Sequence, residues 1–138
     1  MQKNNTPTSF RLYKKQRLCS PTAIEALFAR GADCRGALSF PLRAVWRPDA
    51  ARRSDAPLAF VIVVPKRRLR HAVDRVAMRR RIREAYRLHQ HAFPMPQGVR
   101  MDVGFVYVAD RLTTYAAVER AMLRLLENIA ASAATAQP

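Results

Sequence analysis

Arginine is concentrated in one stretch of the sequence, residues 65–87, which reads PKRRLRHAVDRVAMRRRIREAYR. Only two acidic residues, Asp74 and Glu84, lie within it. A guanidinium group forms forked hydrogen bonds with phosphate oxygens and stacks on flat rings, which suits it to nucleic acids. The stretch is therefore a candidate phosphate-binding segment. Ten of the 25 basic residues of the chain fall in it: Lys66, Arg67, Arg68, Arg70, Arg75, Arg79, Arg80, Arg81, Arg83 and Arg87.

A solvent-exposed helix face is the alternative explanation for such a run of charges. Helices of that kind usually alternate acidic and basic residues, so that side chains four apart attract one another. Here Glu84 can pair with Arg80, Arg81 or Arg87, and the other arginines keep no acidic neighbour. The pattern therefore favours an external polyanion. Contact with about six phosphates would give a slope of log affinity against log salt of about −4 to −5.

Residue types that carry catalysis or bind metals are dispersed. No histidine has a cluster of carboxylates around it in the sequence, as a general base with a partner would need. A two-metal site needs several converging carboxylates, and the cysteines lack CxxC spacing. We expect no catalytic side chain, no metal site and no cofactor bound by the protein. The residues considered are His71, His89, His91, Asp102, Asp110, Glu119, Cys19 and Cys34.

The composition of the whole chain agrees with a polyanionic partner. Its 138 residues fit one domain, and 49% of them are hydrophobic, enough for a folded core. Lys and Arg number 25 against 10 Asp and Glu, giving a net charge of +15 that internal ion pairs cannot neutralise. No apolar run has the length of a signal peptide or a membrane span. We expect a cytoplasmic protein without a membrane partner, monomeric until it meets its polyanion.

The arginine-rich stretch must be placed by a helix over residues 71–90. At about 100° per residue, Met78, Ile82, Ala85 and His89 fall on one narrow stripe. Arg79, Arg83 and Arg87, which are spaced four apart, fall roughly opposite this stripe, with Arg80 beside them. One face of the helix can then dock on a sheet while the other presents guanidinium groups.

The remaining elements follow from hydrophobic spacing and from turn residues. Residues 38–46 alternate, with Leu38, Phe40, Leu42, Ala44 and Trp46 on one face, and Pro41 indicates an edge or bulged strand. Residues 58–64 are apolar throughout, as in a central strand covered on both faces. We expect a flexible basic arm over 1–16, a single domain over 17–130 and a disordered tail over 131–138. Within the domain we expect a helix from Pro21 that Gly31 ends, strands over 38–46, 58–64 and 102–109, and helices over 71–90 and 115–130.

The order of residue types resembles that of the bacterial ribonuclease P protein family. The family hallmark is A-V-x-R-N-x-x-K-R-x-x-R-E on a helix that follows a V-x-K-[KR] strand end. Here residues 64–67 read VPKR and residues 72–84 read AVDRVAMRRRIRE. The opening Arg17-Leu18 with the helix after it, and the strand that begins at Asp102, also match family segments. Two positions depart from the pattern, since Val76 replaces the family Asn and Ile24 replaces an aromatic residue.

This resemblance implies a fold and a set of contacts. The fold is α+β, a small mixed sheet of about four strands packed with three helices. It is a sandwich like that of the ribonuclease P protein and the second domain of ribosomal protein S5. The partners are the catalytic RNA subunit, which supplies the chemistry with its Mg²⁺, and precursor tRNA, whose 5′ leader is removed. The resemblance assigns the RNA contacts to Lys66, Arg67, Arg68, Arg70, Arg75, Arg79, Arg80, Arg83 and Arg87. It assigns the leader groove to Ile24, Phe28, Phe40, Arg43 and Tyr107. Core packing is the alternative for the three aromatic residues: it is as good an explanation as the groove for Phe28 and Tyr107, and it is the one we expect for Phe40.

Two other functions remain open from the sequence. A non-catalytic ribosomal or RNA-assembly protein shares the charge argument, but tRNA 5′ processing would not depend on it. A DNA-binding protein would read bases in the major groove, yet the arginine-rich helix has no Asn or Gln before Gln90 to recognise adenine.

Overall fold

The computed structural model describes residue 12 and residues 21–28, 34–48, 58–92 and 101–136. The predicted arm and Gly31 lie outside these segments, apart from Leu12, which packs against the core. In chain order the elements are α1 (Pro21–Phe28), β1 (Arg35–Ser39), β2 (Leu42–Pro48), β3 (Leu58–Val63), α2 (Ala72–His89), β4 (Met101–Tyr107) and α3 (Tyr115–Ala136).

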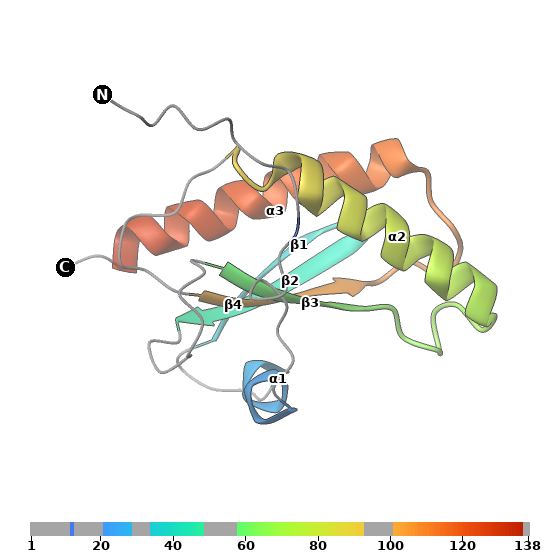
Figure 1. The fold of residues 1–138 in the computed structure, drawn as a ribbon, viewed down its shortest axis with the longest axis horizontal. Helices are drawn as coiled ribbons and strands as arrows, with labels where there is room; N and C mark the ends of the chain where they lie inside the picture. Colours follow the sequence, from blue (N-terminus) through green and yellow to red (C-terminus); the bar gives the residue numbers. More distant parts are fainter. Residues whose placement is uncertain (1–11, 13–20, 29–33, 49–57, 93–100, 137–138) are drawn as a thin grey trace.

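The four strands form one mixed sheet in the order β1-β2-β4-β3. β2 pairs antiparallel with β1 and with β4, whereas β3 lies parallel to β4. A parallel pair needs a long crossover, and α2 is that crossover. α2 and α3 cover one face of the sheet and α1 packs on the other (Figure 1). The predicted α+β class, a small mixed sheet with helices packed on it, is confirmed.

Two strand predictions were wrong. Residues 38–46 form a hairpin rather than one strand, because Phe40 and Pro41 make a turn whose Pro41 carbonyl accepts a hydrogen bond from Val108 N at 2.9 Å. The turn reverses the alternation, so Leu38 pairs with Arg43 and is exposed. β2 is an inner strand, and β3, predicted to be central, lies at the edge.

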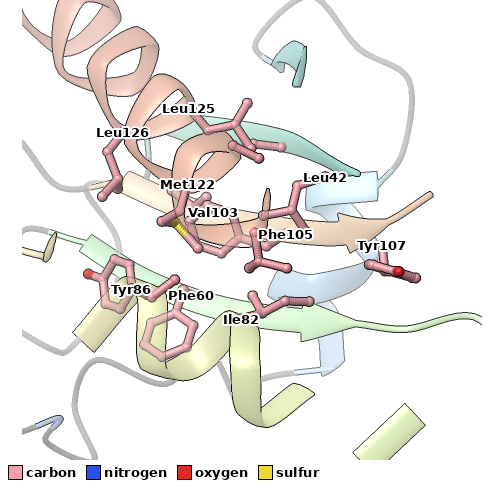
Figure 2. Close-up of a cluster of buried hydrophobic side chains, with 14 of the residues drawn as sticks. Leu42, Phe60, Ile82, Tyr86, Val103, Phe105, Tyr107, Met122, Leu125 and Leu126 are labelled. Atoms are coloured by element: carbon pink, nitrogen blue, oxygen red, sulfur yellow. The ribbon is translucent and has the colours of Figure 1, made fainter. Parts of the chain in front are cut away.

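The main core fills the space between the sheet and the two long helices (Figure 2). The rings of Phe60, Tyr86 and Phe105 are in contact, with Phe60 and Tyr86 4.5 Å apart between centroids. The predicted stripe of α2 is confirmed for Met78, Ile82 and Ala85, all fully buried. The inner face of α3 is likewise buried, and it consists of Val118, Met122, Leu125, Leu126 and Ile129.

α3 runs to Ala136, past the end predicted at residue 130. Ala133 is fully buried in the core, and Trp46 Nε1 donates a hydrogen bond to Ser132 Oγ at 3.0 Å. These contacts order a segment that we expected to be disordered. The expectation was wrong because residues 131–136 are mostly small and show little amphipathic pattern, so the sequence did not reveal that this part of the helix packs on β2. None of the described helices has the length and apolarity that crossing a membrane requires.

α1 packs on β2 and β4 through a second, smaller cluster. Leu27 is buried with Val45 and Ala59, and Ile24 is half-buried against them. The ring of Phe28 lies over Gly104 of β4, where the missing side chain leaves room for it. The close approach of α1 to the sheet therefore depends on this glycine.

Replacing Gly104 by Ala should lower the free energy of unfolding by about 1–3 kcal/mol, because the added group overpacks this contact. Its Cβ would lie 2.6 Å from Phe28 Cζ and 3.2 Å from Leu27 Cδ2. Urea unfolding measures the change. The control is Gly36→Ala, whose Cβ would meet no atom closer than 3.4 Å and should change stability by less than about 0.5 kcal/mol. Equal losses in the two variants would contradict this seating of α1.

Candidate nucleic-acid interface

The outer face of α2 carries the guanidinium groups that the spacing placed there. Since Met78 and Ile82 face the sheet, Arg80 and Arg83 are exposed, and Arg79 is half-buried at the flank of the helix. In the described part of the chain, no carboxylate forms an ion pair with any of these three arginines. Their charges are therefore open to a partner from outside the domain.

Glu84 pairs with Arg87, the last of the three possibilities that the sequence left open. Arg87 Nε and Nη2 donate to the two carboxylate oxygens at 2.9 and 2.7 Å. The hydrogen bond from Arg87 holds the pKa of Glu84 below its usual value, and the pKa of Arg87 is raised in turn. The side chains of Arg87 and Glu84 are 36% and 45% exposed, and ion pairs at the surface stabilise a protein by little. Arg87 can thus exchange this carboxylate for a phosphate at small cost.

Two other arginines on α2 have partners inside the domain. Arg75 Nη1 donates to the carbonyl oxygens of Leu69 and Arg70, both at 2.9 Å. Arg81 Nη1 donates to the carbonyl of Thr113, in the segment that leads into α3. Arg75 was predicted to contact RNA. In the structure its guanidinium group binds the loop between β3 and α2 to the start of the helix.

The loop between β3 and α2 carries four more basic side chains, those of Lys66, Arg67, Arg68 and Arg70. Pro65 O accepts hydrogen bonds from Arg68 N and Leu69 N, and buried Leu69 anchors the turn. Arg68 Nη1 forms an ion pair with Asp110 Oδ1 at 2.9 Å, so the loop is joined to the segment after β4. The two segments line an open cavity of about 940 Å³, and its lining is Lys66, Arg67, Arg68, Leu69, Arg70, His71, Asp74, Asp110, Arg111 and Leu112. Arg111 was missed from the sequence, because its nearness to this loop follows only from the parallel pairing of β3 and β4.

The predicted leader groove is only partly assembled. Phe28 is 39% exposed, and Arg43 is exposed on the same sheet face that α1 covers, beside Val106 in the register. Tyr107 is fully buried on the opposite face, and its hydroxyl is hydrogen-bonded to Arg111 O and to Thr113 Oγ1. Tyr107 therefore cannot contact a ligand in this groove.

Phe40 was expected in the core, and that expectation was wrong. The side chain is 68% exposed at the hairpin turn, where it lines a cleft against α3 and lies outside the α1 groove. The reason is again the turn, which removes Phe40 from the alternation of β2. Of the predicted groove residues, Ile24, Phe28 and Arg43 lie on the α1 side of the sheet.

Comparison with known proteins decides the family. A family model described as Ribonuclease P matches residues 12–130. The chain belongs to the ribonuclease P protein family. Ribonuclease P protein components from two strains of Porphyromonas gingivalis are each 34% identical to it over 128 residues, covering 91% of this chain and 90% of theirs. The component from Chlorobium phaeobacteroides is 28% identical over 134 residues, with 90% of this chain and 91% of that one covered.

The fold of the ribonuclease P protein family is also found by structural comparison. The structure of the Staphylococcus aureus RNase P protein superposes with a TM-score of 0.65. It covers 83% of this chain and 94% of that chain, at 13% sequence identity. At this low identity the likeness supports the fold alone.

Residues 72–84, which carry the family motif, all lie on α2. Val76, which stands at the Asn position of the family motif, is 42% exposed one turn before Arg80. Its side chain lies on the outer face with the open guanidinium groups, so an apolar side chain occupies this part of the surface. The other departure, Ile24, packs against the cluster under α1.

The histidines and acids of the described residues form no cluster of three or more that could hold a metal ion. His89 Nε2 lies 2.8 Å from Glu119 Oε2 and links α2 to α3. His71 and His91 are exposed. These side chains thus serve contacts between elements or lie at the surface.

Arg75→Ala should lower the free energy of unfolding by about 1–3 kcal/mol, because two carbonyl oxygens lose hydrogen bonds from a charged donor. Urea unfolding followed by circular dichroism measures the change. Arg80→Ala is the matched control on the same helix, and it should change stability by less than about 0.5 kcal/mol, since that side chain has no partner within the described residues. A destabilised Arg80→Ala with an unaffected Arg75→Ala would reverse this division of roles.

Proposed function

We propose that this chain is the protein subunit of ribonuclease P, which removes the 5′ leader from precursor tRNA. The subunit binds the catalytic RNA through the outer face of α2 and the loop before it. It also holds the 5′ leader in the groove between α1 and the sheet. The chemistry takes place on the RNA with its Mg²⁺, and the protein contributes binding. The observation that carries the proposal is the row of arginines on α2 without acidic partners, in a chain of this family.

Contact with the RNA subunit rests on electrostatics at named positions. Arg79, Arg80 and Arg83 present three open charges, and Arg87 adds a fourth when it leaves Glu84. Lys66, Arg67 and Arg70 lie at the N-terminal end of the same helix in the loop that Arg75 fastens. Each phosphate that these side chains neutralise contributes about 0.9 to the slope of log affinity against log salt.

Binding of the leader rests on the α1 face of the sheet. Phe28 offers part of an aromatic ring, and aromatic rings stack on unpaired bases of any sequence. Arg43 supplies positive charge at the same face, and exposed Leu38 lies opposite it in the β1–β2 register. A groove of this chemistry suits leaders that differ in sequence from one tRNA to the next.

The triple variant Arg79→Ala, Arg80→Ala and Arg83→Ala should assemble poorly with the catalytic RNA and keep its fold. The salt slope of RNA binding should fall in magnitude by about 2–3, since three phosphate contacts are lost. Filter binding at several salt concentrations and circular dichroism measure the two properties. The matched control replaces the same three residues by Lys, which keeps the charge and should keep most of the slope. An unchanged slope in the Ala variant would defeat the proposed RNA interface.

Arg43→Ala and Phe28→Ala should weaken the reconstituted enzyme's binding of precursor tRNA and leave its binding of mature tRNA unchanged. Loss of one stacked base costs about 1–3 kcal/mol, which is roughly a 5- to 160-fold change in affinity. The assay reconstitutes the enzyme with the catalytic RNA at low Mg²⁺ and measures both RNAs. Arg43 is exposed, so its variant stays informative even if Phe28→Ala unfolds α1. Equal losses for the two RNAs would argue against a leader site on this face.

A further inference from the structure

An exposed aromatic ring stands at the turn between β1 and β2. The turn is fixed by the hydrogen bond from Val108 N to Pro41 O, yet Phe40 is 68% exposed. A large apolar side chain in water gains nothing from the hydrophobic effect, and a rigid turn that displays it is suited to receiving a ligand.

The ring borders a cleft against the first half of α3. The cleft has a volume of about 660 Å³, within the range of about 300–1,000 Å³ found for small-molecule sites. Its apolar wall includes Ala117 and Ala121, and its rim carries Arg120 and Arg124. Both arginines are exposed, and in the part of the chain that the structure describes neither pairs with a carboxylate. Glu127 also lines the cleft, so the net charge of the side chains around the cleft is +1.

The residue types of the cleft match single-stranded nucleic acid. A flat ring stacks on a base, and two guanidinium groups one helical turn apart bind phosphates along the backbone. Like charges four apart cost the helix a little stability, which a bound phosphate would return. No donor set for a particular base is needed, so such a site tolerates any sequence.

The position of the cleft indicates which RNA it takes. Phe40 lies in the turn itself, Arg43 is the second residue of β2 after it, and Arg43 belongs to the groove proposed for the leader. A strand that leaves that groove past Arg43 reaches the turn and then the cleft. We propose that the cleft between Phe40 and α3 is a second single-stranded RNA site, which holds the part of the 5′ leader beyond the α1 groove. This inference rests on the proposed function and extends it to a surface on the other side of the sheet.

The test uses the reconstituted enzyme with precursor tRNAs that carry a leader of about 5 or about 15 nucleotides, the range of single-stranded sites on small domains. Phe40→Ala, and separately Arg120→Ala with Arg124→Ala, should weaken binding of the long-leader precursor about tenfold. Binding of the short-leader precursor should stay the same. Phe40→Trp should bind the long-leader precursor as tightly as the native chain does, because Trp keeps a stacking surface that Phe40→Ala removes. Glu127→Gln should strengthen binding of the long leader, since it removes a repelling charge.

Asn128→Ala is the control on the same helix outside the cleft, and it should affect neither precursor. An equal loss for short and long leaders would overturn the inference and assign the surface to the RNA subunit or to the fold. No loss in any cleft variant would also overturn it. Arg43→Ala separates the two proposals: if it weakens both precursors while the cleft variants weaken neither, only the second site fails. If Arg43→Ala also has no effect, the leader groove itself fails.

Discussion

The docking of α2 on the sheet determines the surface of this protein. Met78, Ile82 and Ala85 are fully buried, so the helix has one rotational setting, and that setting turns Arg80 and Arg83 toward solvent. Rotating the helix would bury unpaired guanidinium groups, whose desolvation costs several kcal/mol per charge. The chain has 15 more basic than acidic side chains, so most of its cations cannot find acidic partners within the domain, and Arg80 and Arg83 have none among the described residues. The packing of α2 in the core therefore determines which charged side chains are exposed at the surface.

Arginines within a few residues of each other on α2 have different tasks, and helical spacing alone did not distinguish them. Arg75 and Arg81 hold loop carbonyls, Arg87 holds Glu84, and Arg79 has no ion-pair partner within the described segments. The difference arises from what lies beside each side chain in space. Arg75 meets the loop before its own helix, and Arg81 meets the segment that leads into α3. The neighbour of Arg81 lies 32 positions away and is set by the packing of α2 against the segment after β4, which no local pattern encodes.

The two long helices were predicted closely because amphipathicity is local: the buried faces of α2 and α3 follow from residues three and four apart. The sheet was predicted less well. The apolar run of β3 indicated a central strand, yet the strand lies at the edge, with helices on both faces of the sheet keeping it apolar. The alternation through Pro41 suggested one strand, and the turn there inverted the face of Leu38 and freed Phe40. Strand order and the phase of alternation depend on pairing between distant segments. The face of the sheet on which Tyr107 lies depends on the same pairing, and it was therefore not predicted.

The hydrogen bond from Trp46 to Ser132 joins residues 86 positions apart in the chain. α3 closes the core over β2, and it is synthesised after all four strands of the described sheet. Until it emerges, the inner side chains of the sheet, such as Phe105 and Val103, lack part of their cover. The inner face of the sheet is therefore open to aggregation until α3 has been made and packs on it.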